Sequence, residues 1–260
     1  MSEKTIIKIL GCGSSGGIPD VAFGWGACDS KNPKNYRTRS SILIQTANIN
    51  LLVDTSPDLR HQLLSAEVSR IDAVFLTHMH ADHTHGINEL RRISQAYNKV
   101  IPVYGDFATI SDVIKRFNYL FDPDPKNKHW YSTCLSGIVM KDNPADICGI
   151  SCTWIVQDHG PCNTLGLRVG NFAYTIEMKD MPPENIEVLR GVDLWIVECL
   201  EMGVNPTHTG LQQVLQWAEK IKPSRVILTN MGLKIDYDTL SKVLPSHITP
   251  AYDGLTIELY

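Results

Sequence analysis

The residues most able to do chemistry lie together in one short stretch, Thr77-His78-Met79-His80-Ala81-Asp82-His83-Thr84-His85-Gly86. It holds four histidines and one aspartate within eight residues, directly after an apolar run. Histidines that are buried together need polar partners or a metal ion. We expect His78 and His80 to point to one side of a turn, with Asp82 and His83 following where the chain enters a helix. Nitrogen and carboxylate donors of this kind suit zinc, manganese or iron; a surface turn with incidental metal affinity is the alternative.

The elements that must position these residues are apolar runs that end in polar residues, as buried strands do. Such runs lie at 51–54, 73–78, 194–198 and 225–230, with further strands at 40–45 and 166–176, the latter turning at Gly170-Asn171. Helices are predicted over 59–65, 86–96, 107–117, 183–189, 211–221 and 236–244, and a loop over 122–128. Strands occur in clusters as well as in alternation with helices, which favours two layers of sheet with helices outside. We expect a single domain over residues 1–260.

Composition excludes several classes of protein. The 24 Lys and Arg against 28 Asp and Glu give a net charge of −4, which argues against a protein that coats nucleic-acid polymers or anionic membranes. No run of about 18 apolar residues predicts a transmembrane helix, and the N-terminus lacks the apolar stretch of a signal peptide. The seven cysteines are irregularly spaced, as expected for reduced thiols. We therefore expect a cytoplasmic globular protein.

The histidine motif resembles the signature of metallo-β-lactamase-fold metallohydrolases. Further stretches resemble the PhnP-like branch, whose best-known member is a phosphoribosyl cyclic phosphodiesterase: GCGSSGGIP at 11–19, WGACD at 25–29, DTSPDLR at 54–60 and AYDG at 251–254. The resemblance implies an α+β fold, an αββα four-layer sandwich in which two mixed β-sheets carry helices on both outer faces. It also implies a metal site between the sheets.

The resemblance further implies which residues bind metal. One ion would be held by His78, His80 and a later histidine, and His159 matches that position. A second ion would take Asp82, which we also count as catalytic, and His83. The family's bridging aspartate is matched by Glu177.

Two positions depart from the family pattern. Glu177 is longer than aspartate by one methylene, about 1.5 Å, against a ligand-distance tolerance of ~0.2 Å. Either the backbone shifts there or the carboxylate binds only one ion. The last histidine ligand falls within 229–232 and is matched to Gly232, which offers no side chain. We expect one well-formed site for Zn²⁺ or Mn²⁺ and a second that is weak or empty; His247 could substitute, although it also fits an exposed loop residue.

Other residues have predicted roles around the metal. The resemblance assigns His208 as the general acid for the leaving group, with a helix cap or a surface residue as the alternative. Asp54 would orient a ligand histidine, or else cap the following turn. Arg37 and Arg39, beside Lys34, could bind a substrate phosphate, although a solvated basic turn fits them equally well.

Together these features predict a metal-dependent phosphodiesterase that uses a metal-activated water. Its substrate would be a small phosphate ester, of the cyclic nucleotide or phosphoribosyl cyclic phosphate class. The alternative is a degenerate, one-metal or metal-poor relative that binds a nucleotide or phosphate ligand with little or no turnover. Glu177 and Gly232 motivate that alternative. The sequence leaves open the native metal, the exact substrate and whether the chain is a homodimer.

Overall fold

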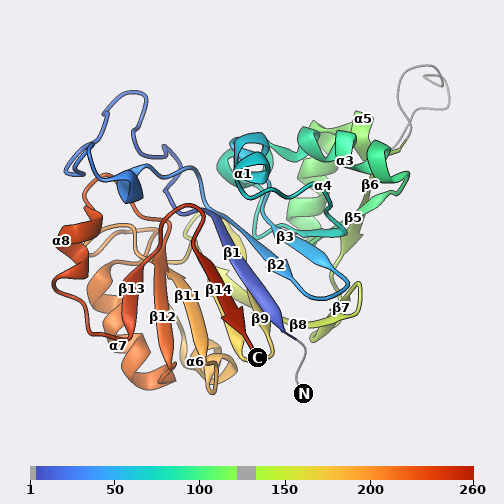
Figure 1. Ribbon diagram of the computed structural model, residues 1–260. Helices are drawn as coiled ribbons and strands as arrows, with labels where there is room; N and C mark the ends of the chain where they lie inside the picture. Colours follow the sequence, from blue (N-terminus) through green and yellow to red (C-terminus); the bar gives the residue numbers. More distant parts are fainter. Residues whose placement is uncertain (1–3, 122–132) are drawn as a thin grey trace. The chain divides into compact units, whose positions relative to one another are not determined.

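The computed structural model describes residues 4–121 and 133–260, which build two seven-stranded mixed sheets (Figure 1). Each sheet belongs to its own compact unit. The first unit comprises Met1–Leu10, Ser41–Asp142 and Gly254–Tyr260, and the second comprises Gly11–Ser40 and Asn143–Asp253. The predicted loop at 122–128 lies outside the described residues.

The sheet of the first unit has the strand order β14-β1-β2-β3-β4-β5-β6. Its strands are β1 (Thr5–Gly11), β2 (Ser41–Gln45), β3 (Asn50–Val53), β4 (Ala73–Phe75), β5 (Ile101–Gly105), β6 (Leu135–Val139) and β14 (Thr256–Leu259). β1 pairs with β14, and β2 with β3, in antiparallel fashion, while β3 to β6 are parallel. The parallel strands read as short apolar runs because both of their faces are buried.

Helices of the first unit cover one face of this sheet. They are α1 (Leu59–Ser65), α2 (Ala81–Thr84), η2 (Ile87–Glu89), α3 (Leu90–Tyr97), α4 (Phe107–Arg116) and α5 (Asn118–Phe121). Leu59 of α1, Leu90 of α3 and Val113 of α4 share one buried cluster with Leu52 and Val74 of the sheet. Burying each such side chain contributes about 1.5–3 kcal/mol, so this cluster fixes the helices that flank the histidine motif.

The sheet of the second unit has the order β13-β12-β11-β10-β9-β8-β7. Its strands are β7 (Ala145–Ile147), β8 (Ile150–Asp158), β9 (Asn163–Val169), β10 (Phe172–Thr175), β11 (Leu194–Glu198), β12 (Arg225–Thr229) and β13 (Ile248–Pro250). β7 to β10 are antiparallel, and β10 to β13 are parallel. This unit also holds η1 (Pro33–Asn35), α6 (Pro183–Leu189), α7 (Leu211–Ile221) and α8 (Tyr237–Ser241).

Several sequence predictions are confirmed by these elements. The helices predicted at 59–65, 183–189 and 211–221 and the strand at 194–198 have the predicted bounds. The hairpin around Gly170-Asn171 is formed by β9 and β10. The helix predicted at 86–96 is instead divided into η2 and α3, and the one at 236–244 shortens to α8. Within the described residues, no helix is long and apolar enough to cross a membrane.

The parallel strands end in the residues that the predicted chemistry needs. In the first unit, Asp54 follows β3, and in the second, Glu177 and Asn230 follow β10 and β12. All three have left-handed backbone, with φ values of 63°, 58° and 52°. Asp and Asn adopt this conformation more readily than most residues, whereas Glu does so rarely. Such strain is typically retained at functional sites.

Candidate functional site

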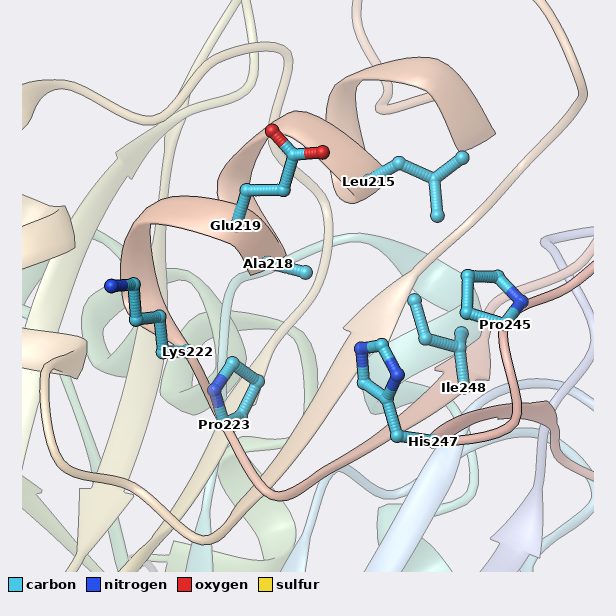
Figure 2. A pocket seen from close by; sticks show the side chains of 8 residues that line it. All are labelled: Leu215, Ala218, Glu219, Lys222, Pro223, Pro245, His247 and Ile248. Atoms are coloured by element: carbon cyan, nitrogen blue, oxygen red, sulfur yellow. The ribbon is translucent and has the colours of Figure 1, made fainter.

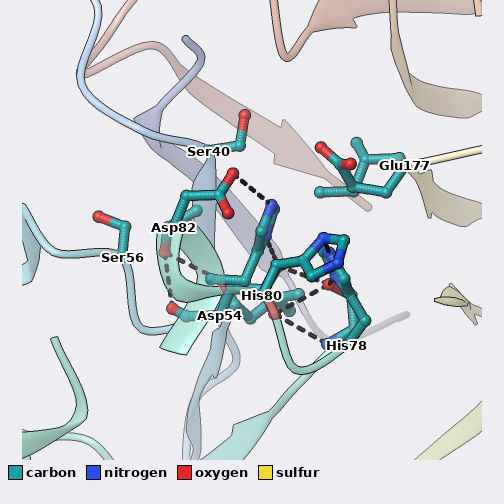
Figure 3. A network of polar contacts seen from close by, with 12 residues as sticks. Ser40, Asp54, Ser56, His78, His80, Asp82 and Glu177 are labelled. Atoms are coloured by element: carbon teal, nitrogen blue, oxygen red, sulfur yellow. Dashed lines mark hydrogen bonds and ion pairs between the residues drawn. The ribbon is translucent and has the colours of Figure 1, made fainter. Parts of the chain in front are cut away.

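In the first unit, the histidine motif is built around the carboxylate of Asp54 (Figure 3). Its Oδ1 accepts a hydrogen bond from the backbone N of Thr77 at 2.8 Å, and its Oδ2 accepts one from the Thr77 hydroxyl at 2.9 Å. Oδ2 also lies 2.7 Å from Nδ1 of His83. The parallel pairing of β3 with β4 makes this possible, because it places residue 54 beside residue 77 at the same edge of the sheet.

Asp54 determines which ring nitrogens of two histidines carry a proton. Since a carboxylate only accepts, His83 carries its proton on Nδ1. The Thr77 hydroxyl donates to Asp54 and therefore accepts from Nδ1 of His78, at 3.0 Å. The unprotonated Nε2 of His78 then lies 2.8 Å from Nδ1 of His80. Rings fixed in this way present nitrogen lone pairs in the manner of metal ligands.

The contacts with His83 also shift the pKa values of Asp54 and Asp82. Burial raises the pKa of Asp54, although the charge and hydrogen bond of His83 oppose this rise. Burial would also raise the pKa of Asp82, but the hydrogen bond and the charge of His83 outweigh it and lower that pKa to about 2. Asp82 is therefore ionised at neutral pH, with its Oδ2 3.2 Å from Nε2 of His83. A carboxylate facing an imidazole nitrogen suits a divalent cation between them once that nitrogen has lost its proton.

The second unit contains a further group of ionisable side chains, which we call the acid–histidine cluster: His159, Glu177, Glu198, His208 and Asn230. Nδ1 of His159 donates to the carbonyl oxygen of Thr207 at 2.9 Å, so the ring proton lies on that side. Its Nε2 faces Oε2 of Glu177 at 3.2 Å. Two lone pairs at this separation require a proton or a cation between them. The donor chemistry of His159 and Glu177 therefore fits a metal ion.

Glu198 and His208 form a buried carboxylate–imidazole pair in this cluster. Oε1 of Glu198 accepts hydrogen bonds from the backbone N of Met178 at 2.7 Å and of Thr209 at 3.1 Å. Its Oε2 lies 3.0 Å from Nδ1 of His208, whose side chain is 21% exposed. This contact turns Nε2 of His208 away from Glu198, in the manner of an acid–base histidine. Sequence reasoning recognised Glu198 only as a strand end and missed its position beneath His208.

Asn230 is the second site residue that sequence reasoning missed. Its Nδ2 donates to Oε1 of Glu177 at 2.5 Å and to Oε2 of Glu198 at 3.2 Å. The two carboxylates can only accept, so the amide is oriented with its NH₂ group toward them. Its Oδ1 lies 3.2 Å from the Ser40 hydroxyl, which also lies 3.0 Å from the carbonyl oxygen of Gly13. The ligand atoms of Glu177, Glu198 and His208 lie within 4.8 Å of one another.

Asn230 is therefore an alternative to Gly232 as the position of the missing ligand. A Cβ at Gly232 would lie 2.8 Å from the carbonyl oxygen of Leu200, so backbone occupies the space beside that residue. Within the stretch 229–232, Asn230 is the residue whose side chain reaches Glu177 and Glu198. The left-handed backbone of Asn230, with φ 52°, directs it there.

The two arginines predicted to bind phosphate differ in their surroundings. Arg37 is 1% exposed, and its guanidinium donates to the carbonyl oxygen of Ile235 at 2.8 Å and to Oδ1 of Asn35 at 3.0 Å. Arg37 thus has partners within the protein, and its contact with substrate stays a prediction. Arg39 is half-buried along the glycine turn, where a Cβ at Gly17 would lie 3.7 Å from its Nη1. A phosphate contact from Arg39 stays a prediction.

His247, which could have replaced a missing ligand, lies in a different environment. It lines a groove of about 490 Å³ between α7 and the segment before β13, with Leu215, Ala218 and Pro245 (Figure 2). The groups of potential ligands found among residues 4–121 and 133–260 do not include it. His247 is therefore a suitable control in experiments on the ligand histidines.

One curated protein resembles this chain over most of its length, and another over about a third of it. The family described as Beta-lactamase superfamily domain matches residues 49–231. An octanoyltransferase of Porphyromonas gingivalis is 31% identical over 252 residues, which are 95% of this chain and 50% of that protein. A ribonuclease Z of Nanoarchaeum equitans is 32% identical over 88 residues, 32% of this chain and 28% of that protein. The chain thus spans half or less of the length of these two relatives.

A solved structure resembles the whole chain. The crystal structure described as a new diphosphatase from the PhnP family is 27% identical, covers 98% of this chain and 97% of its own, and superposes with a TM-score of 0.90. The expected metallo-β-lactamase fold, with two mixed sheets of seven strands each, is confirmed. The nitrogen and carboxylate donors of the motif and of the acid–histidine cluster support a divalent metal.

Proposed function

Because the chain belongs to the beta-lactamase superfamily domain family, we propose that it is a metal-dependent phosphodiesterase that hydrolyses a small phosphate ester. A metal-dependent hydrolase of the PhnP-like branch is supported by this membership and by the similarity to the PhnP-family diphosphatase. The substrate class we infer is a cyclic nucleotide or a phosphoribosyl cyclic phosphate. A cytoplasmic location and the absence of a nucleic-acid polymer or membrane partner stay predictions.

The observation that carries the proposal is the Glu198–His208 pair beside Glu177 and His159. Glu198 is fully buried and anchored by two backbone N–H groups, so it holds Nδ1 of His208 in one orientation. His208 can then deliver a proton from Nε2 to the alkoxide that leaves the phosphorus. A merely structural histidine does not need a buried, pre-oriented carboxylate partner.

We propose that His78, His80 and His159 hold the first ion, with Zn²⁺ or Mn²⁺ as the metal. When bound, such an ion lowers the pKa of water toward about 7 and polarises a phosphoryl oxygen. Asp54 orients the ring of His83 directly and that of His78 through Thr77. Asp82 and His83 would contribute to a second ion, and Arg39 to binding the phosphate.

A degenerate relative with little turnover is the second candidate, and Asn230 favours it. An NH₂ group directed at Glu177 and Glu198 repels a cation, and the two carboxylates hold the amide in that orientation because they can only accept. This supports a second site that is weak or empty. The two candidates differ in metal content and turnover.

The deciding experiment starts from protein purified without added metal or chelator. Elemental analysis gives the ions bound per chain, and turnover is measured with bis-p-nitrophenyl phosphate and with a ribose cyclic phosphodiester under Zn²⁺ and Mn²⁺. Hydrolysis of either ester by the metal-bound protein supports the phosphodiesterase. Two bound ions per chain together with hydrolysis contradict the degenerate candidate. At most one ion and no turnover of either ester contradicts the phosphodiesterase.

The role of His208 is tested by comparing leaving groups. Nitrophenolate is a weak base and leaves without a proton, whereas the alkoxide of the cyclic ester needs an acid. His208→Ala should lower kcat for the cyclic ester by about 10²- to 10⁴-fold, with a much smaller loss for the nitrophenyl ester and unchanged metal content. The control His247→Ala should leave both rates unchanged. Equal losses on both esters would contradict a general acid at His208.

A further inference from the structure

Arg116 is the last residue of α4, and its side chain contacts the histidine motif. Its Nη2 donates to the carbonyl oxygen of Met79 at 2.5 Å. Its Nη1 lies 3.0 Å from Nε2 of His85 and 3.4 Å from the hydroxyl of Thr84. One guanidinium thus contacts the motif at three places, although it is more than 30 residues away in the sequence.

The contact with Met79 falls at the centre of the motif. Met79 is the residue between His78 and His80, so its peptide unit joins the two ligand candidates. The Thr84 hydroxyl, which Arg116 also contacts, donates to the carbonyl oxygen of His80 at 2.8 Å. Arg116 therefore restrains the backbone on both sides of His80.

Other groups hold the remainder of the motif, so the contribution of Arg116 is separable. The backbone N of Thr55 donates to the carbonyl oxygen of His83 at 2.7 Å, and the carboxylate of Asp54 contacts the His83 ring. These contacts come from the residues that follow β3. Arg116 supplies the corresponding restraint on residues 79–80 from α4.

The guanidinium is itself held in place. Asp112, one turn earlier in α4, forms an ion pair with Nη2. The guanidinium carbon lies 5.8 Å from the ring centre of Phe117, which packs edge-on against the His85 ring at 5.7 Å. A planar fork with several donors can reach a carbonyl oxygen, an imidazole and a hydroxyl together, whereas a lysine ammonium acts as a single point charge.

From this geometry we propose that Arg116 is a positioning residue for the metal ligands His78 and His80. It acts through the Met79 peptide and the Thr84 hydroxyl, without contacting the ion. The inference rests on the proposed function, because it assumes that the motif binds a divalent metal. Partners that orient ligands typically change metal affinity by 10–100-fold when they are removed.

The test compares Arg116→Met, Arg116→Lys and the control Arg92→Met, which removes an exposed arginine of α3. Zn²⁺ affinity is measured by competition with a chromophoric chelator, and coordination geometry by the visible absorption of the Co²⁺-loaded protein. The Tm of the metal-free protein reports folding. We expect Arg116→Met to weaken Zn²⁺ binding by about 10–100-fold and to alter the Co²⁺ spectrum. Arg116→Lys should recover part of the affinity, and Arg92→Met should behave as the unmodified protein.

The outcomes separate the inference from the proposed function. Arg116→Met with unchanged Zn²⁺ affinity and an unchanged Co²⁺ spectrum overturns the inference alone. Failure of the unmodified protein to bind Zn²⁺ or Co²⁺ overturns the proposed metal site and the inference with it. If Arg116→Met does not fold, Arg116→Lys decides: weaker affinity with an altered spectrum at unchanged Tm supports the inference, and unchanged binding overturns it.

Discussion

The amide of Asn230 lies between two buried carboxylates, Glu177 and Glu198, and donates to both. Carboxylates this close repel each other when both are ionised, and a neutral amide offsets that repulsion less than a cation would. A positive charge would stabilise the two carboxylates best, but the group between them is a neutral amide. The amide of Asn230 bears directly on the charge that this cluster offers to a second ion.

We predict that Asn230→His raises the occupancy of a second ion. An imidazole nitrogen replaces the NH₂ group, and histidine tolerates the left-handed backbone better than most residues. Second-ion affinity should rise by at least about tenfold, measured as ions per chain during titration with Zn²⁺ or Mn²⁺.

Gly232→His is the matched control for this prediction. It adds the same side chain two residues away, where Cβ would lie 2.8 Å from the carbonyl oxygen of Leu200. It should lower stability and leave the ion count unchanged. A second ion gained with Gly232→His but not with Asn230→His would show that Gly232 is the ligand position after all.

At the scale of elements, the junction between the histidine motif and η2 depends on Gly86. Its backbone N donates to the carbonyl oxygen of Thr55 at 2.9 Å. A Cβ at this position would lie 1.9 Å from the carbonyl oxygen of Ser56. The glycine therefore allows the segment after β3 to approach the end of the motif closely.

We predict that Gly86→Ala destabilises the protein by about 1–3 kcal/mol, as overpacking of a tight contact does. Urea unfolding measures this change. Gly203→Ala is the control, because a Cβ there meets nothing within 4 Å, and it should change stability by less than about 0.5 kcal/mol. Equal stability of both variants would mean that the backbone at residue 86 relaxes without cost.

The sequence predicted the bounds of those helices and strands whose apolar residues follow a regular pattern. Helices α1, α6 and α7 repeat apolar residues with helical spacing, and β11 is an apolar run that ends in Glu198. The patterns did not show which position, Asn230 or Gly232, faces the carboxylates of the cluster. The direction of a side chain after a strand depends on one backbone angle. The patterns also did not show that Arg37 is buried, because one of its partners, Ile235, lies 198 residues away.

The carboxylate of Asp253 joins segments from both ends of the second unit. Asp253 accepts hydrogen bonds from the backbone N of Cys12 at 3.1 Å and of Thr38 at 2.7 Å, and from their side chains. Burial raises the pKa of Asp253 to about 6, against the lowering effect of these hydrogen bonds. The ordinary aspartate value is 3.8, so between about pH 4 and 6 the native protein binds more protons than the unfolded chain.

We predict that Asp253 makes the free energy of unfolding decrease as the pH rises from about 4 to 6. The sign follows because protonation is favoured in the native state, and the change is at most about 3 kcal/mol. Urea midpoints at several pH values should show this contribution as the difference between the unmodified protein and Asp253→Asn. The exposed control Asp238→Asn should keep the pH dependence. An identical pH slope in Asp253→Asn would contradict the raised pKa.

At the scale of the whole molecule, the three ligands proposed for the first ion lie far apart in the sequence. His159 follows His80 by 79 residues. An unfolded chain has no preformed site, so an ion that binds only the native state adds its binding free energy to stability. The metal should therefore stabilise the folded chain as a whole, and this can be measured without any substrate.

We predict that Zn²⁺ or Mn²⁺ at 100 times its Kd raises the free energy of unfolding by about 2.7 kcal/mol, and that a chelator reverses the rise. In thermal unfolding this corresponds to an increase in Tm of about 5–10 °C for a chain of this size. His78→Ala and His159→Ala should each remove most of the increase, because three ligands are needed for one tight site. His61→Ala, an exposed histidine of α1, should retain it. If His78→Ala alone removed the increase and His159→Ala kept it, the ion would be held by the histidine motif without His159.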